Sequence, residues 1–443
     1  MSVLLFAQAP MRIEIKLSNF EKDTLFLGSL VGKRHYLLDT AVLDKMTRTF
    51  VFEHPTERPE GAYIVITKLG ESAFQILLQP RKQQFSIDAD ANQVYTTAIV
   101  QGSVDNDAYL HYLSFSEPLF ASLDTLYIKQ IKHSEAALEV EQTEKKLAKN
   151  IQVAKTILPP SSLFTKLVQL DAQRLELGTV RSNQDAVWFF SQVPMSDERF
   201  ANSSQLEAIV DRFMSFIVPQ QSDTALAAMD WILAQTKPSP ENYKHYIRYF
   251  LNTYSRPELA NLDALYVRIS QNYLAKGEAP FLDTSAISRI GRRAATVEPL
   301  TVGKIIPNIR LTRRDSSKLA LHDINARYTL VFLWDPDCGH CKRVSPKVVE
   351  LYNELHTEGL EVYAICCKNG SQTPKCWEYI DQTPEIAPWL HVNDPNDSNR
   401  FRSIFDVRTT PMCYMIDSQK RIVYKVIGEN LDPDIVRSIV RKK

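Results

Sequence analysis

The spacing of apolar residues changes twice along the chain, and the first stretch has the pattern of β-strands. From Arg12 to about Ser103, apolar and polar residues alternate in short runs such as RIEIKLS, RHYLLDT, AYIVIT and FSIDA, with turn residues between them. Alternation with a period of two places one side of each strand in a core, and several such runs in succession are typical of an antiparallel sandwich or barrel. We therefore predict an N-terminal antiparallel β-sandwich or barrel over residues 10–104.

Beyond Val104 the apolar residues recur about every three to four positions, which is the period of a helix with one buried face. Several prolines, among them Pro159, Pro219 and Pro238, each precede a new helical pattern. This placement is consistent with helices because proline is tolerated in the first turn, where its missing N–H has no partner. Residues 105–298 are predicted to form a central all-α domain.

Residues 299–443 alternate between strand and helix patterns. The runs YTLVFLW, EVYAICC and PMCYMID have the composition of buried strands, and we expect helices after Cys338, from Pro374 and from Asp432. Buried strands connected through helices predict a C-terminal α/β layer with a mostly parallel or mixed sheet. The predicted fold class is therefore multi-domain α+β, with a β domain, a helical domain and an α/β domain in that order.

Composition and charge narrow the function without defining it. Lys plus Arg equal Asp plus Glu at 52 each, so the chain lacks the basic excess of nucleic-acid-binding proteins, and we expect no nucleic-acid partner. The sequence has no run of about 18 or more apolar residues, which predicts that no helix spans a membrane.

The first nine residues allow two interpretations. A short apolar run at positions 3–6 is followed by Ala7-Gln8-Ala9, which has the small-x-small form of a signal-peptidase site, but no positive charge precedes it. We favour the remnant of a secretory signal peptide over residues 1–9, which would place the protein in the periplasm or cell envelope. The other interpretation is a segment that simply precedes the first strand.

All six cysteines lie after position 337, at 338, 341, 366, 367, 376 and 413. They are too few for a disulfide scaffold, and the first 337 residues contain no thiol. We expect Cys366, Cys367 and Cys413 to be small buried apolar residues in strands. Cys376, near a predicted helix start, is the best candidate among these four for a second redox role.

The motif Cys-Gly-His-Cys, Cys338 to Cys341, lies where the strand YTLVFLW gives way to a helix. At a helix start, free backbone N–H groups and the positive end of the helix dipole favour a thiolate. A thiolate attacks disulfides, so Cys338 is the predicted nucleophile and Cys341, one turn later, the predicted resolving residue. Because the reaction would use only the Cys338–Cys341 dithiol and disulfide, we expect no metal or organic cofactor.

Charged neighbours modulate this pair in opposite directions. His340, when protonated, would favour the thiolate and make the pair more oxidising, whereas Asp335 and Asp337 place negative charge before Cys338. The direction of electron flow therefore stays open at this point.

The segment around the motif resembles the thioredoxin superfamily, in particular the TlpA-like and ResA-like envelope thiol-disulfide oxidoreductases. Trp334, four residues before Cys338, is close to the position of the family's active-site tryptophan. Pro346, five residues past the second cysteine, matches the proline that kinks the family's first long helix. Thr410-Pro411 looks like the family's cis-proline. The resemblance implies that Trp334 shields the cysteine pair and that Thr410 and Pro411 position an extended client peptide.

The resemblance also implies partners and a location. The partners would be client proteins with disulfides or thiols and, for a reductase, a membrane thiol electron donor. The whole arrangement looks like multi-domain thioredoxin-fold proteins of the Bacteroidota cell envelope, which implies export. Two departures concern proton transfer: the strand YTLVFLW contains no acid, and Val344 occupies the position of the ResA-type glutamate. The proton acceptor is therefore unassigned.

Three other interpretations stay open. A Cys-x-x-Cys pair can be half of a zinc site, with Cys366, Cys367 and Cys376 as further candidates, although two adjacent strand residues face opposite sides. A thiol peroxidase would share the fold, but its motif requires Thr and Pro where this chain has Asp335 and Val331. A binding or assembly protein with an auxiliary redox domain is consistent with the long region before residue 299.

Overall fold

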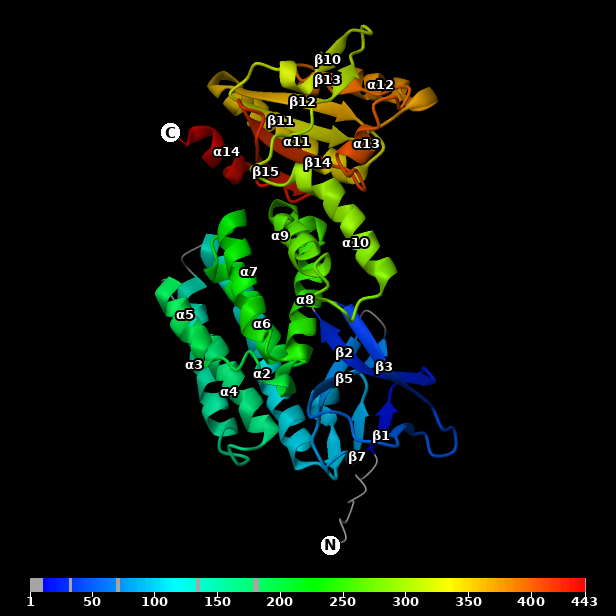
Figure 1. Cartoon of the computed structure of the whole chain (residues 1–443), viewed down its shortest axis with the longest axis vertical. Coiled ribbons are helices and arrows are strands. Elements are labelled where there is room, and N and C mark those ends of the chain that lie inside the picture. Colours follow the sequence, from blue (N-terminus) through cyan, green and yellow to red (C-terminus); the bar gives the residue numbers. More distant parts are fainter. Residues whose placement is uncertain (1–10, 32–33, 69–71, 133–135, 178–182, 443) are drawn as a thin grey trace. The chain divides into compact units, whose positions relative to one another are not determined.

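The computed structural model describes residues 11–31, 34–68, 72–132, 136–177 and 183–442 (Figure 1). The described residues form two compact units. One is made of Met1–Pro219 and Asp230–Tyr249, and the other of Gln220–Met229 and Phe250–Lys443. Residues 1–9, for which we predicted a signal-peptide remnant, lie outside the described residues.

The N-terminal part is a β domain of two four-stranded sheets, in the orders β4-β1-β7-β8 and β3-β2-β5-β6. Apolar residues of both sheets, such as Ile13, Leu25 and Phe85, meet in one core, so the predicted two-layer β domain is confirmed. One pair, β1 with β7, is parallel, whereas the sequence predicted antiparallel pairing throughout. The strands are β1 (Met11–Ser18), β2 (Thr24–Val31), β3 (Arg34–Val42), β4 (Phe50–His54), β5 (Gly61–Lys68), β6 (Ser72–Leu78), β7 (Gln84–Asp90) and β8 (Ile99–Gln101).

Gly102, directly after β8, is a position at which the fold depends on glycine. Its φ is +87°, and a Cβ there would lie 2.8 Å from the carbonyl oxygen of Gln84. We expect Gly102→Ala to destabilise the β domain by about 2 kcal/mol, because both the backbone angle and the contact become unfavourable. Thermal unfolding followed by circular dichroism measures this change.

Gly291, inside a helix, is the matched control. Nothing lies within 4 Å of a Cβ built there, so Gly291→Ala is expected to raise stability by about 0.5–1 kcal/mol. Equal effects of the two substitutions would contradict this account of Gly102.

The central region is helical, as predicted. After the Pro159-Pro160 break, the hydroxyl of Ser162 accepts a hydrogen bond from the N–H of Thr165 at 3.1 Å and caps the helix α4. The short helix α1 (Val94–Thr97) lies between β7 and β8 in the β domain. The helices of the central region include α2 (Val104–Lys132), α3 (Ala137–Ala154), α4 (Leu163–Glu176), α5 (Asn183–Gln192), α6 (Ser204–Arg212), α7 (Ser222–Thr236), α8 (Pro240–Tyr254), η5 (Pro257–Leu262), α9 (Ala264–Ile269) and α10 (Thr284–Val297). Within the described ranges, none of the helices has the length and apolar character that a membrane crossing requires.

The C-terminal domain is built on a seven-stranded sheet in the order β10-β9-β13-β12-β11-β14-β15 (Figure 1). The central strand β11 runs parallel to β12 and antiparallel to β14, so the predicted mixed sheet is confirmed. The strands are β9 (Arg310–Thr312), β10 (Lys318–Ala320), β11 (Tyr328–Trp334), β12 (Leu360–Cys366), β13 (Leu390–Asn393), β14 (Met412–Asp417) and β15 (Ile422–Ile427).

Helices cover both faces of this sheet. One core contains residues of α11 (Gly339–Leu355), α12 (Pro374–Gln382) and α14 (Pro433–Arg441) together with Phe332 of β11. The other contains α13 (Phe401–Ile404), the chain before β11, and Val331. Because β11 is buried on both faces, its sequence is a continuous apolar run, and its end at Trp334 fixes where the next helix begins.

A buried ion pair connects this sheet with the helical segment of the same unit. Lys425 of β15 donates to the carboxylate of Asp263, which follows η5, and the two residues are 4% and 6% exposed. Burial raises the pKa of Asp263 to about 6, although the nearby Lys425 ammonium lowers it. The pair therefore holds two charged groups that are almost entirely removed from water.

Candidate active site

Cys338 lies at the N-terminus of α11, where strand β11 has just ended. Its backbone is extended, with φ −82° and ψ 116°, and its carbonyl oxygen accepts the first hydrogen bond of the helix from Lys342 at 3.2 Å. The N–H of Cys338 in turn donates to the carbonyl of Asp335 at 3.1 Å, which closes the turn before the helix. Cys338 is half-buried, and both Cys338 and Cys341 are free thiols.

The surroundings of Cys338 favour its thiolate. Burial is the largest influence on its pKa and raises it. Hydrogen bonds from the side chains of Thr410 and Cys341 and from the backbone of Cys341 and His340 together outweigh it and lower the pKa from the ordinary value of 9.0. The helix start thus has the effect that its position predicts, because N–H groups without a helical partner face the sulfur.

Cys341 lies behind Cys338 in the apolar core and is 1% exposed. Burial raises its pKa to about 12, although the N–H of Asp335, 3.4 Å from the Cys341 sulfur, lowers it. The two cysteines therefore differ, because the pKa of the half-buried Cys338 is lowered and the pKa of the buried Cys341 is raised.

The peptide bond between Thr410 and Pro411 is cis, as the resemblance implied. The thiol of Cys338 donates to the carbonyl oxygen of Thr410 at 3.4 Å, so the loop before β14 lies against the nucleophile. The carbonyl of Pro411 accepts a hydrogen bond from the N–H of Gly428 at 2.8 Å, which anchors this loop to the end of β15.

Trp334 ends β11, just before the motif, and Pro346 follows the motif within α11. Trp334 is 2% exposed and shares its core with Cys341, and its ring neighbours are Tyr379, with centroids 5.3 Å apart, and His391, at 6.4 Å. Pro346 lies inside α11. The tryptophan therefore contributes buried surface under the site.

The side chain of His340 is exposed and engages Glu429, which follows β15. Arg343 of α11 also binds Glu429, with Nε 2.9 Å from Oε2. Hydrogen bonds from Arg343, and then from His340, lower the pKa of Glu429 to about 2. A carboxylate 89 residues away in the sequence therefore offsets the positive charge that a protonated His340 would bring.

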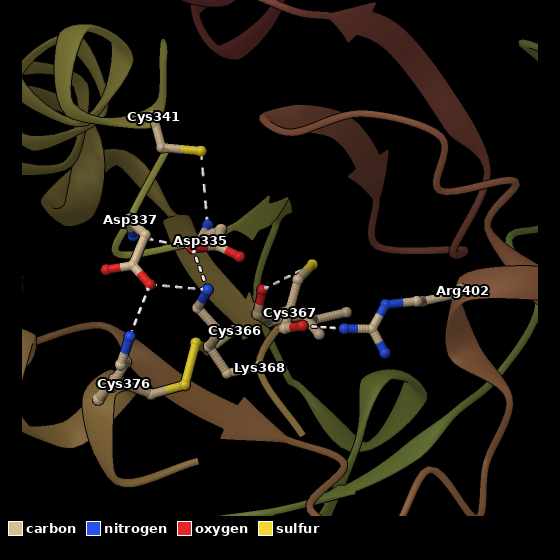
Figure 2. The surroundings of a disulfide bond; sticks show 10 residues. Asp335, Asp337, Cys341, Cys366, Cys367, Lys368, Cys376 and Arg402 are labelled. Atoms are coloured by element: carbon tan, nitrogen blue, oxygen red, sulfur yellow. Dashed lines mark hydrogen bonds and ion pairs between the residues drawn. A yellow bond between two sulfur atoms is a disulfide. The ribbon is translucent and has the colours of Figure 1, made fainter. Parts of the chain in front are cut away.

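The carboxylates of Asp335 and Asp337 are also paired. Lys368 lies 3.1 Å from Asp335 and 2.9 Å from Asp337 (Figure 2). Lys375 lies 3.1 Å from Asp337. The negative charge of this turn was evident from the sequence, but its partners were not, because the lysines come from the chain after β12.

The structure corrects the interpretation of Cys366 as a buried side chain without a covalent role. Cys366, at the end of β12, forms a disulfide with Cys376 of α12, across a Cα–Cα distance of 6.2 Å (Figure 2). Nothing in a separation of 10 residues indicated that the two ends meet. Cys367 and Cys413 are buried free thiols, and burial raises the pKa of each.

The described residues contain no group of three or more His, Cys, Asp and Glu side chains placed to hold a metal ion. Val344 is fully buried in the same core as Cys341, so an acid is absent from that position of α11.

Comparisons with known proteins agree with this geometry. Residues 302–425 match the AhpC/TSA family, and residues 11–109 match a domain of unknown function, DUF4369. The thiol-disulfide oxidoreductase ResA of Bacillus cereus is 24% identical over 135 residues, which are 30% of this chain and 75% of that protein.

Solved structures are similar over different lengths. A domain described as a "possible thiol-disulfide isomerase" from Cytophaga hutchinsonii is 32% identical, and the match covers 32% of this chain and 95% of that domain with a TM-score of 0.29. A thioredoxin-like protein from Bacteroides caccae is 17% identical, covering 59% of this chain and 94% of that one with a TM-score of 0.47. With the family match, the ResA relationship and the seven-stranded fold, the C-terminal domain is a thioredoxin-superfamily domain of the TlpA/ResA type, and its activity is that of an oxidoreductase.

Proposed function

We propose that this protein is an exported thiol-disulfide oxidoreductase that acts on protein disulfides through Cys338 and Cys341. One observation carries the proposal: a half-buried thiol with a lowered pKa starts a helix, 3.4 Å from the backbone of a cis-proline loop, with a second thiol buried behind it. Thiolate, client-binding backbone and resolving thiol are the parts that disulfide exchange requires.

In the first step, the Cys338 thiolate attacks one sulfur of a client disulfide. The client S–S bond breaks, a mixed disulfide forms with Cys338, and the other client sulfur leaves as a thiolate. The carbonyl of Thr410 would accept a hydrogen bond from an extended client backbone once Cys338 no longer donates to it. In this role Thr410 and Pro411 position the client.

In the second step, Cys341 attacks the Cys338 sulfur and releases the second client thiol. The proton of Cys341 passes to the client thiolate that departs in this step. The thiolate released in the first step takes a proton from water, which replaces the proton that Cys338 gave up on ionising. The client thus gains two electrons and two protons while Cys338 and Cys341 become a disulfide. The N–H of Asp335, 3.4 Å from the Cys341 sulfur, stabilises the negative charge that this sulfur acquires. Burial keeps Cys341 protonated until the mixed disulfide has formed.

Export to the periplasm or cell envelope is the second part of the proposal. The Cys366–Cys376 disulfide supports it, because structural disulfides persist in oxidising compartments and are rare in the cytosol. The partners would be client proteins with disulfides or thiols and, for a reductase, a membrane thiol donor that reduces the Cys338–Cys341 disulfide again.

Alkylation against pH tests the assignment of the two cysteines. We expect iodoacetamide to modify Cys338 in a pH range clearly below that of glutathione, because its thiolate is stabilised, and to modify Cys341 only in strongly alkaline solution. Mass spectrometry of the peptide that contains both residues distinguishes the two sites. If Cys338 titrates like glutathione, the proposal is wrong.

Insulin reduction tests the proposed activity itself. With dithiothreitol as the electron source, the wild-type protein is expected to accelerate precipitation of the insulin B chain. A binding or assembly protein would show no acceleration. Consumption of hydrogen peroxide at a rate far above disulfide reduction would instead favour a thiol peroxidase.

A further inference from the structure

The second disulfide closes a loop that carries two lysines. Cys366 ends β12, Cys376 lies in the first turn of α12, and the two residues are 2% and 0% exposed. A client protein therefore has no access to this bond. The residues between the two cysteines include Lys368 and Lys375, which lie two positions after Cys366 and one before Cys376.

These lysines bind the two carboxylates that precede the nucleophile. Lys368 Nζ lies 3.1 Å from Asp335 Oδ1 and 2.9 Å from Asp337 Oδ2, and its side chain is only 13% exposed. Lys375 Nζ lies 3.1 Å from Asp337 Oδ2. Figure 2 shows Lys368 with Asp335 and Asp337 close to the Cys366–Cys376 bond. Asp335 is thus paired with Lys368, whereas Asp337 contacts both Lys368 and Lys375.

The carboxylates belong to the turn that places both active-site cysteines. The N–H of Asp337 donates to Asp335 Oδ1 at 2.8 Å, and the N–H of Cys338 donates to the Asp335 carbonyl at 3.1 Å. The N–H of Asp335 also lies 3.4 Å from the Cys341 sulfur. Lys368 therefore holds the turn as well as neutralising it.

We propose that the Cys366–Cys376 disulfide positions Lys368 so that its ammonium group stays against the carboxylates of Asp335 and Asp337. This pairing in turn sets the reactivity of Cys338. The inference deepens the proposed function and rests on it. Lys368 and the disulfide do not touch the reacting sulfurs, so their role is to position charge.

The physical reason is repulsion between like charges. Two unpaired carboxylates in the turn before Cys338 would disfavour its thiolate, whereas paired carboxylates do not. A stabilised thiolate makes the reduced pair more stable and the protein more oxidising. Near Cys338, Arg343 of α11 forms an ion pair with Glu429, which follows β15, and His340 contacts the same carboxylate. The Lys368 pairing thus leaves the site without uncompensated negative charge.

Lys368→Met is the direct test, with alkylation of Cys338 against pH as the measurement. At about pH 5 we expect alkylation about threefold slower than in the wild type, as a higher pKa requires, and a reduction potential shifted to more reducing values. The double variant Cys366→Ala/Cys376→Ala should shift both in the same direction. Adding Lys368→Met to this double variant should change the alkylation profile and the potential little further, because the disulfide and Lys368 act through the same interaction.

Two controls separate charge from structure. Lys318→Met, which removes an exposed lysine of β10, should leave the pH profile unchanged. In Lys368→Met/Asp335→Asn, the carboxylate left without its lysine is removed, and the wild-type profile should return. The inference is overturned if a variant that lacks Lys368 or the disulfide still folds and alkylates Cys338 with the wild-type dependence on pH. If instead the wild-type Cys338 itself titrates like glutathione, the proposed function fails, and the two failures are distinct.

Discussion

Cys338→Ser is expected to reduce insulin-disulfide turnover to the uncatalysed background. Serine keeps the shape of the helix start but supplies no thiolate, so no mixed disulfide forms. The turbidity assay with dithiothreitol measures this loss. Cys338→Ser activity within a few fold of the wild-type rate would contradict the assignment of the nucleophile.

Cys341→Ser should behave differently, although its turnover is also lost. Cys338 remains free to attack, but the mixed disulfide has no resolving thiol, so covalent complexes with clients accumulate and appear on non-reducing gels. Cys413→Ala is the matched control. Cys413 is a buried free thiol of β14 with a pKa raised by burial. Its removal should leave disulfide exchange close to the wild-type rate.

Lys425→Met is expected to have the largest effect on stability. It leaves Asp263 buried without its counter-charge, which costs about 3–5 kcal/mol of unfolding free energy in comparable pairs. Replacing both partners, as in Lys425→Met/Asp263→Leu, should restore most of the loss, because no buried charge then remains. Urea unfolding followed by tryptophan fluorescence measures both variants.

The loss should also depend on pH. The pKa of Asp263 in the folded protein, about 6, is above its ordinary value of 3.8, so the stability that this group contributes is complete below the ordinary value and falls as the pH rises through about 6. Without Lys425 the pKa of Asp263 rises further, and its ionisation becomes more costly. Lys425→Met should therefore lose more stability at pH 8 than at pH 5.

Arg314→Met is the control for this pair. Arg314 and Asp381 form an ion pair whose side chains are 58% and 53% exposed, and solvent screens it, so the unfolding transition should hardly move. A pH-independent loss in Lys425→Met, or an equal loss in Arg314→Met, would contradict the role assigned to burial.

Sequence analysis predicted the long, strongly patterned elements of the fold correctly. Strand β11 is a continuous apolar run, the helix after Cys338 follows it directly, and α14 begins at the Asp432 cap. It missed β10 and β13, which have three and four residues. So few residues contain no measurable period, and only pairing with neighbouring strands makes them part of the sheet.

The candidate site was predictable to the extent that it is local in sequence. The Cys-Gly-His-Cys motif at the end of a strand indicated the helix start, and the resemblance indicated the cis peptide at Pro411. Three features were not predictable: the Cys366–Cys376 bond, the lysines that pair with Asp335 and Asp337, and the partnership of His340 with Glu429. Each depends on residues that the fold brings together from other elements.

The amino-acid sequence alone determined the order of a β, a helical and an α/β region and the place where a thiolate can form. Periodicity, strand ends and helix starts act over a few residues, so neighbouring residues are sufficient to specify them. Only the tertiary structure decided how much charge surrounds that thiolate and which cysteines are joined. Coulombic and covalent partners are selected by distance in space, and the sheet order that sets those distances follows from the packing of the whole domain.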